Sequence, residues 1–101
     1  MTFSPELIVS PEARRDLRSI LRYTERKWGS SQRDDYADRI VTAMNDLATF
    51  PELGATRDDI SMGLRARSVG HHLILYRLQG STVNITRILH ENMDISALAE
   101  S

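Results

Sequence analysis

Cysteine is absent from the 101-residue sequence, and this absence excludes several kinds of site. Without thiols the chain forms no disulfide, binds no metal through a thiolate and has no cysteine nucleophile. The lack of disulfides fits a reducing compartment. No stretch approaches the ~18 consecutive apolar residues that a membrane span needs, and the N-terminus lacks the basic-then-apolar pattern of a secretion signal. We therefore expect a cytoplasmic protein that does not associate with membranes.

An excess of one charge is also missing, because the net charge is only −1. This balance argues against nucleic-acid binding that is driven by overall charge. The charges are nevertheless unevenly distributed. Residues 11–29 hold six Lys/Arg and three Asp/Glu, whereas residues 30–62 hold three Lys/Arg and seven Asp/Glu. Faces of opposite sign are therefore expected.

Motifs for cofactors and metals are missing too. The sequence contains no glycine-rich phosphate loop, no zinc-ligand spacing and no nucleophile elbow. His71 and His72 are adjacent on a predicted strand and so point to opposite faces, which makes them a poor metal pair. We expect neither cofactor nor metal, and a domain that grips another macromolecule rather than processing a small molecule.

Periodicity predicts a helical hairpin in the first half of the chain. Glu6–Val9 is a short extended segment, and Ser10 with Pro11 starts a helix that runs to about Lys27. Gly29 ends this helix, and a capping box at Ser31 and Asp34 starts a second one, which ends before Pro51. The apolar faces consist of Ala13, Leu17, Ile20, Leu21, Thr24 and Trp28 on the first helix and of Tyr36, Ile40, Val41, Met44, Leu47 and Ala48 on the second.

Alternation with a period of two predicts strands in the second half, at Leu64–Val69, His72–Leu78 and Val83–His90. The links between them are short enough for hairpins. The prediction is a single α+β domain over residues 1–101, in which a helical hairpin packs on a three- to four-stranded antiparallel sheet (β-α-α-β-β-β). Glu6–Val9 would add the edge strand. The tail, 95–101, is expected to be flexible, with one helical turn around Ala97-Leu98.

A row of arginines on the first helix is the first candidate binding feature. The arginines recur every four residues, at Arg14, Arg18, Arg22 and Arg26. On a helix they form one ridge, and like charges at this spacing repel each other. Two interpretations remain open: a solvated face that meets the acidic second helix, or a stripe that binds a partner.

Further candidates lie on the predicted strands. Arg65 and Arg67 share a face and suit a phosphate or carboxylate through paired N–H donors, unless that face is simply solvated. His72 shares a face with Ile74 and Tyr76. Arg87 is expected on the apolar face of the last strand, with Val83, Ile85 and Leu89, where it needs a partner or a cleft. His90 would then lie on the opposite face.

Short strings of residues in a fixed order run from about Ala13 to Asp94. The first half contains Tyr23, Trp28-Gly29, Gln32, Tyr36 and Pro51-Glu52-Leu53-Gly54. The second half contains Asp59-Ile60, Gly63-Leu64-Arg65, Gly70-His71-His72, Ile74, Tyr76-Arg77 and Arg87-Ile88-Leu89-His90-Glu91-Asn92-Met93-Asp94. In order and spacing these strings resemble the ParE toxins, which belong to the RelE/ParE superfamily of bacterial toxin–antitoxin systems. The closing Arg-Ile-Leu-His-x-x-Met-Asp is the most specific part.

The resemblance implies a toxin of a plasmid-stabilisation system. Such a toxin would inhibit DNA gyrase by binding it, without being an enzyme itself, and a ParD-like antitoxin would neutralise it. The antitoxin's flexible C-terminal segment would wrap around the toxin and fill an apolar groove. The arginine row and the Arg65/Arg67 pair are then plausible contacts for an acidic antitoxin segment. His72, Tyr76, Arg87 and His90 are further candidate contacts.

The alternative is a RelE-type endoribonuclease that cuts messenger RNA on the ribosome. Arg65, Arg67 and Arg87 would supply cations, and His90 would be the general acid or base. Against this reading, Lys27 is the only lysine, acids precede the first strand of the meander, and no aromatic residue follows His90. A third class, a nucleic-acid-binding module that uses the arginine row, is disfavoured by the net charge and the acidic second helix.

Overall fold

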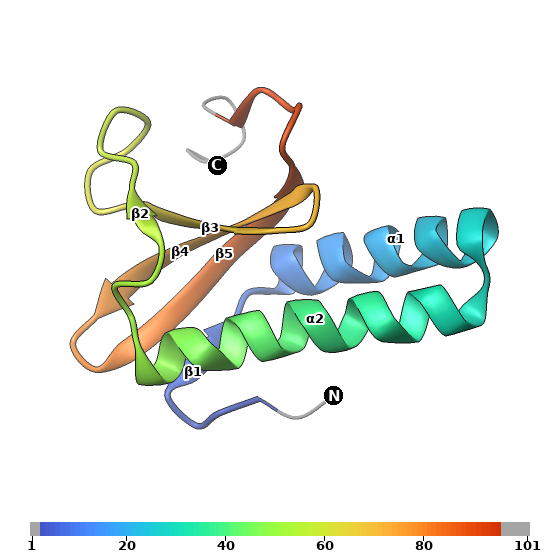
Figure 1. Cartoon of the computed structure of the whole chain (residues 1–101). Helices are drawn as coiled ribbons and strands as arrows, with labels where there is room; N and C mark the ends of the chain where they lie inside the picture. Colours follow the sequence, from blue (N-terminus) through green and yellow to red (C-terminus); the bar gives the residue numbers. More distant parts are fainter. Residues whose placement is uncertain (1–2, 96–101) are drawn as a thin grey trace.

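The computed structural model describes residues 3–95, and the predictions for the tail beyond Ile95 lie outside this range. Along the chain the elements are β1 (Leu7–Val9), α1 (Pro11–Trp28), α2 (Ser30–Thr49), β2 (Ala55–Thr56), β3 (Arg65–Val69), β4 (His72–Gln79) and β5 (Thr82–His90). The predicted α+β class and the helical hairpin before a meander are confirmed (Figure 1). Among residues 3–95, neither helix combines the length and the apolar character that crossing a bilayer requires.

The sheet has five strands in the order β1-β5-β4-β3-β2, and it is mixed rather than wholly antiparallel. β3, β4 and β5 form the predicted antiparallel meander. β1 lies beside β5 in the parallel direction, with Leu7 opposite Val83 and Val9 opposite Ile85. The prediction of a three- to four-stranded antiparallel sheet is therefore corrected. Alternation along β1 fixes its buried face but not the direction of its neighbour, and the two-residue β2 is too short to show any period.

The two helices begin at different kinds of N-cap. Ser10 caps α1 with its side chain, which accepts a hydrogen bond from the Ala13 N–H at 3.0 Å. α2 has no side-chain cap, so the capping box predicted at Ser31 and Asp34 is wrong. Gly29 takes the N-cap position with a φ of 93°, and its carbonyl accepts the Arg33 N–H at 3.1 Å. Glycine adopts this φ without strain, so the link needs only one residue.

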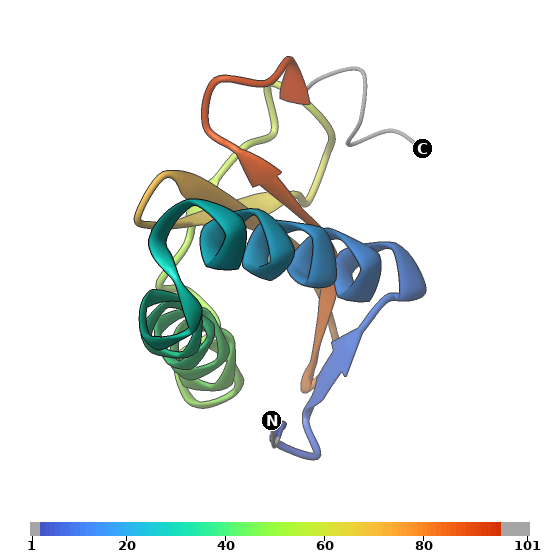
Figure 2. The ribbon, with the colours of Figure 1, turned by 90° about the vertical axis from the view of Figure 1, so that its right-hand side faces the viewer.

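Each face of the sheet carries its own apolar cluster. The first core cluster lies between the sheet and the helices and includes Leu17, Ile40, Met44, Leu47, Ile74 and Tyr76. The second core cluster, on the opposite face, consists of Leu64, Ala66, Leu75 and Leu89, with Ile60, Leu73 and Ile95 packed against it. In Figure 2 both helices lie on one side of the sheet, and α1 crosses α2 at an angle. Trp28, predicted for the buried face of α1, is 64% exposed at the end of the hairpin.

A β-bulge in β5 changes which side chains face the helices. Leu75 pairs with Arg87 but Tyr76 pairs with Ile85, so Thr86 is an extra residue in β5. A bulge shifts the alternation by one residue. Ile85 and Ile88 both belong to the first core cluster, whereas Leu89 belongs to the second. The prediction that Arg87 shares a face with Ile85 is therefore wrong: by alternation it lies on the face of Leu89.

Candidate functional site

A groove separates the free end of the helical hairpin from one end of the sheet. Its volume is about 810 Å³, and its lining comes from α1, α2, the β3–β4 turn, the first residue of β4 and the last residue of β5. Figure 1 shows that the helical hairpin extends beyond the strands on this side. We call it the hairpin groove, defined by Tyr23, Lys27 and Trp28 on one wall and Tyr36, Arg39, His71, His72 and His90 on the other.

The three histidines of the chain gather on one wall of the hairpin groove. Strand pairing places His72 directly opposite His90, and their rings meet edge to face with centroids 5.3 Å apart. The His71 ring stacks against His90 at 6.3 Å. His71 stays at the surface, where its Nδ1 is 3.0 Å from a carboxylate oxygen of Glu91. Sequence reasoning missed this cluster, because only the β4–β5 register brings His90 to the turn that carries His71 and His72.

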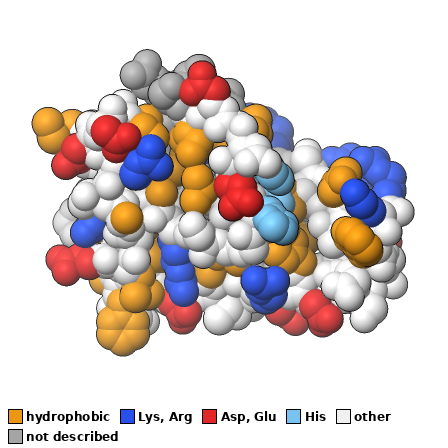
Figure 3. Space-filling view, turned by 45° about the horizontal axis from the view of Figure 1, so that its top comes forward, with side chains coloured by type: hydrophobic (Ala, Val, Ile, Leu, Met, Phe, Trp, Pro, Cys, Tyr) orange, Lys and Arg blue, Asp and Glu red, His pale blue; other side chains and the backbone are white. Residues whose placement is uncertain are grey.

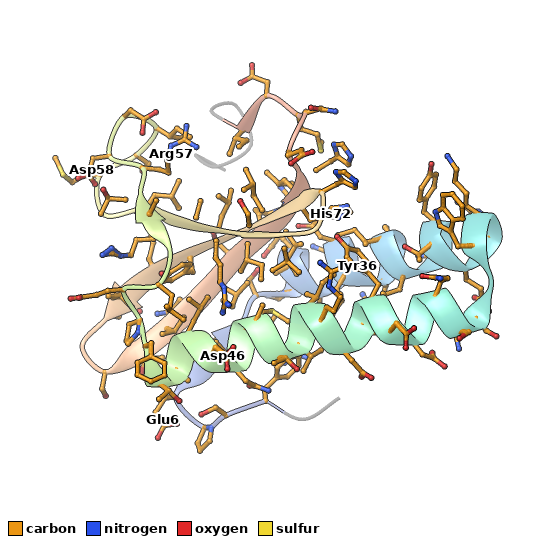
Figure 4. The ribbon with its side chains drawn as sticks, in the orientation of Figure 1. Glu6, Tyr36, Asp46, Arg57, Asp58 and His72 are labelled. Atoms are coloured by element: carbon orange, nitrogen blue, oxygen red, sulfur yellow. The ribbon has the colours of Figure 1, made fainter. Side chains whose placement is uncertain are left out.

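Tyr36 connects α2 to this cluster. Its hydroxyl donates to the Val69 carbonyl at 3.1 Å and lies 2.5 Å from Nδ1 of His72. The tautomer of His72 determines which partner carries the hydrogen in the Tyr36–His72 bond. Figure 4 shows the two labelled side chains reaching toward each other from α2 and β4. Gly70 is required beside them, because a Cβ there would lie 2.8 Å from the Tyr36 hydroxyl.

Burial shifts the titration of both partners. Burial lowers the pKa of His72, and the charges of His90 and His71 lower the pKa further. Burial also raises the pKa of Tyr36. Both shifts favour the neutral forms, so the Tyr36–His72 pair holds this wall in place as a neutral hydrogen-bonded unit near pH 7. Within residues 3–95, no set of three or more His, Asp or Glu side chains is arranged to hold a metal ion.

Arg87 is held by an acid that the sequence analysis did not connect to it. Its Nε and Nη2 donate to the two carboxylate oxygens of Asp16 on α1, at 2.8 and 3.0 Å. The backbone N–H of Ile88 donates to the same carboxylate at 3.0 Å. The side chains of Arg87 and Asp16 are only 22% and 16% exposed, and the bond to Asp16 raises the pKa of Arg87. The arginine therefore has the partner that its position required, and it ties β5 to α1.

Arg65 and Arg67 share a face as predicted, but α2 and the chain that follows it cover that face. Nη1 of Arg67 donates to the Ala43 carbonyl at 2.7 Å, and Nη1 of Arg65 donates to the Gly54 carbonyl at 3.4 Å. Both guanidinium groups are thus engaged within the chain rather than presented as a free pair.

Tyr76, a candidate contact residue, is fully buried. Its hydroxyl donates to the Pro51 carbonyl at 2.6 Å and accepts the Gly54 N–H at 2.9 Å. This correction follows from the side-chain volume, because a tyrosine on the helix-covered face of β4 fills the core and needs a hydrogen-bond partner there. Tyr76 fixes the segment that leaves α2 and offers no surface to a partner.

The arginine row on α1 stays exposed. Arg14 bonds to the Val9 carbonyl at 3.3 Å, and its guanidinium lies 5.4 Å from the centre of the Phe3 ring. Among residues 3–95, the ion pairs include none from Arg18, Arg22 or Arg26. The acidic second helix therefore does not neutralise the row. A role in binding a partner remains a prediction.

The four residues proposed for a nuclease do not form one site. Arg65 and Arg67 lie under α2 and the segment after it, and Arg87 pairs with Asp16. His90 instead joins the histidine cluster of the hairpin groove. By alternation along β5, His90 and Arg87 point to opposite faces, as predicted.

Comparison with known proteins gives consistent results. The family model described as "ParE toxin of type II toxin-antitoxin system, parDE" matches residues 7–95. Toxin ParE1 of Mycobacterium tuberculosis H37Rv is 33% identical over 93 residues, which cover 91% of this chain and 95% of the relative. Toxin ParE1 of Caulobacter vibrioides is 34% identical over 89 residues, with coverages of 88% and 92%.

A solved structure described as a chromosomal ParDE TA system from P. aeruginosa has a similar fold. The TM-score is 0.73 at 22% sequence identity, over 83% of this chain and 92% of that one. The similarity therefore covers most of both chains.

Proposed function

Because the chain belongs to the ParE toxin family of type II toxin–antitoxin systems, we propose that it arrests growth by binding DNA gyrase. It would act in the cytoplasm as a single toxin domain over residues 1–101. The observation that carries the proposal is the family match over residues 7–95, which includes the closing Arg-Ile-Leu-His-x-x-Met-Asp pattern at Arg87–Asp94. An action by binding alone is supported by the separation of Arg65, Arg67, Arg87 and His90, which leaves the nuclease mechanism without an assembled site.

A ParD-like antitoxin is the proposed partner that holds the toxin inactive. The face of the sheet that is turned away from the helices suits it, because the second core cluster leaves Leu73, Ile60 and Ile95 only partly buried there. Orange side chains gather over this face in Figure 3. The exposed row Arg18, Arg22 and Arg26 would attract an acidic antitoxin segment, and the ordering cost of a flexible segment is offset when it covers a large surface.

Expression with and without the antitoxin tests the proposal. The adjacent reading frame is expected to encode a short protein with a ribbon-helix-helix N-terminus and an acidic tail. Expression of the toxin alone should arrest growth, and co-expression with this neighbour should restore growth. Purified toxin should inhibit supercoiling by gyrase or trap cleaved DNA. Normal growth despite folded, accumulated toxin would rule the proposal out.

The nuclease alternative predicts a different product in the same cells. Codon-positioned cuts would appear in ribosome-bound messenger RNA, and they would disappear in the His90→Ala variant. Gyrase would then supercoil DNA normally in the presence of purified toxin. Mapping the 5′ ends of messenger RNA after induction separates the two mechanisms.

A further inference from the structure

We propose that the hairpin groove is the surface that grips the toxin's protein target, and that it receives an acidic segment carrying an aromatic or large apolar side chain. The inference rests on the proposed function, since it assumes that the chain acts by binding a protein. It goes beyond that function by assigning the contact to a specific surface and by stating the chemistry of the segment that fits it.

The charges of the lining favour a carboxylate-bearing partner. Lys27 on α1 and Arg39 on α2 line the groove together with three histidines, and no Asp or Glu is among the described residues that line it. In the space-filling view of Figure 3, the pale blue histidines face a group of orange (hydrophobic) and blue (Lys, Arg) side chains at the end of the hairpin. Glu91 pairs with the lining residue His71 at 3.0 Å, whereas a carboxylate that enters beside Lys27 and Arg39 would have its charge complemented rather than repelled.

The hairpin wall adds an exposed aromatic platform. Tyr23 is 53% exposed and Trp28 is 64% exposed. Nζ of Lys27 lies 5.7 Å from the centre of each ring, so the cation and the two rings form one unit. Tryptophan and tyrosine dominate the binding energy of many protein interfaces because they bury a large area at a small cost in side-chain entropy. Neither ring is buried in the core of the toxin. A partner that covers both rings would therefore bury much of their exposed apolar surface.

The opposite wall is already organised for binding. Tyr36 is fixed by its bonds to Val69 and His72, and the guanidinium group of Arg39 lies 5.5 Å from the centre of the Tyr36 ring. Groups held in place before binding lose little entropy when the partner arrives. The groove therefore combines a rigid wall on the sheet side with an exposed aromatic wall on the hairpin.

The surroundings of the groove favour a peptide over a nucleic acid. Asp35 and Asp38 are exposed on α2, next in sequence to the lining residues Tyr36 and Arg39, and Glu91 lies beside the lining residue His71. A polynucleotide carries phosphates on both sides of any bound nucleotide, so its flanking charges would meet these acids. A peptide with one or two carboxylates at the groove and apolar residues beside them would avoid this repulsion.

The composition of the groove favours the target over the antitoxin. Long-lived complexes use more apolar interfaces, whereas exchangeable contacts are more polar and rich in aromatic residues and arginine. On the face of the second core cluster, the partly buried Ile60, Leu73 and Ile95 offer apolar surface of the kind that a long-lived antitoxin complex needs. The hairpin groove combines aromatic, cationic and polar side chains, as expected for a target that the toxin binds only after it has been released from the antitoxin.

A variant with Lys27→Glu and Trp28→Ala tests the assignment. Both side chains are exposed, so the fold should be retained, which circular dichroism checks. The matched control is Arg15→Glu, which makes the same charge change on α1 outside the groove. Growth arrest and inhibition of gyrase supercoiling are measured for each protein, and calorimetry measures the affinity of each for the antitoxin.

The double variant should inhibit gyrase at least tenfold less well, while its affinity for the antitoxin changes less than threefold. Arg15→Glu should match the wild type in both measurements. Unchanged inhibition in the double variant would overturn the proposal. Lost antitoxin affinity, alone or together with lost inhibition, would assign the groove to the antitoxin or to both partners and would equally overturn it.

Two further outcomes separate this inference from the proposed function. If the wild type arrests growth without inhibiting gyrase, gyrase is the wrong target, and loss of growth arrest in the double variant still supports the groove. A wild type that does not arrest growth would overturn the proposed function itself.

Filter binding with single-stranded DNA tests whether the groove is instead a nucleic-acid site. If the wild type binds the DNA and Lys27→Glu abolishes this binding, the groove binds nucleic acid and the proposal is contradicted.

Discussion

At the scale of single residues, Asp16 satisfies three hydrogen-bond donors at once. One carboxylate on α1 accepts two bonds from the Arg87 guanidinium group and one from the Ile88 N–H. The ion pair is mostly shielded from water, so a missing acid would leave an arginine and an amide group without partners. Losing one member of a buried pair costs more than the pair itself contributes to stability.

Asp16→Ala should therefore lower the free energy of unfolding by about 3 kcal/mol, because a shielded cation and a backbone donor lose their acceptor. Urea denaturation followed by circular dichroism measures the change. The control is Asp38→Ala, an exposed acid on α2 whose loss should change stability by less than about 0.5 kcal/mol. Equal effects of the two substitutions would contradict this role for Asp16.

His72 makes stability depend on pH. Burial holds its folded-state pKa below the usual 6.5, and His90, His71 and Glu91 are the charged neighbours. Below the usual value the unfolded chain binds a proton at His72 that the folded chain does not, so the free energy of unfolding falls as the pH decreases. The contribution is fully present above the usual pKa and is lost progressively as the pH falls to the depressed one.

His72→Gln removes this titration and should flatten the pH dependence between about pH 6.5 and pH 5, where histidine is the side chain that ordinarily titrates. Urea denaturation at several pH values compares the slopes of the variant and the wild type. The carboxylates Glu6 and Asp59 have lowered pKa values and therefore act at more acidic pH. Identical slopes in this window would contradict the assignment to His72.

At the scale of elements, local signals predicted the helices and the meander well. Ser10-Pro11, Gly29 and Pro51 mark helix boundaries through capping and backbone geometry, which depend on neighbouring residues only. The parallel partner of β1 depends on a contact between residues about 76 positions apart, such as Leu7 and Val83. No local pattern encodes such a contact.

The candidate site was harder to predict because it depends on register. The extra residue Thr86 carries no glycine or proline signal, yet it determines that Ile88 faces the helices and Arg87 does not. The histidine cluster likewise exists only because His72 and His90 pair across two strands. The arginine row was predicted correctly as a ridge, since a helical period is a local property.

β1 offers a test of its buried face within three residues. Leu7 and Val9 are 7% and 6% exposed and belong to the first core cluster, whereas Ile8 is 55% exposed. The double variant Leu7→Ala, Val9→Ala should lose about 4 kcal/mol or more in free energy of unfolding, because both residues leave cavities. Ile8→Ala is the matched control and should lose less than about 1 kcal/mol. A similar loss in both proteins, measured by urea denaturation, would mean that β1 is not packed as described.

At the scale of the whole molecule, one sheet carries two apolar clusters. β3, β4 and β5 contribute to both, so neither cluster can separate without breaking strands that the other requires. Adjacent residues of β5 belong to opposite clusters, Ile88 to the first and Leu89 to the second. This arrangement predicts one cooperative unfolding transition.

Ile88→Ala and Leu89→Ala should each lower the free energy of unfolding by about 2–5 kcal/mol, since both residues are buried. Both variants should unfold in a single transition with the wild-type denaturant slope. Urea titrations followed by circular dichroism and by hydrogen exchange test this. A separate early transition in Leu89→Ala would show that the second core cluster unfolds independently.

The exposure of Trp28 also has an optical consequence. It is the only tryptophan of the chain, and its ring is 64% exposed on the wall of the hairpin groove. Indole emission moves to shorter wavelength when water leaves the ring. Unfolding the free toxin should therefore change the emission maximum of Trp28 little. A protein that binds in the groove and covers the ring should move the emission maximum to shorter wavelength. The chain thus carries an intrinsic reporter of its own binding surface, which needs no label.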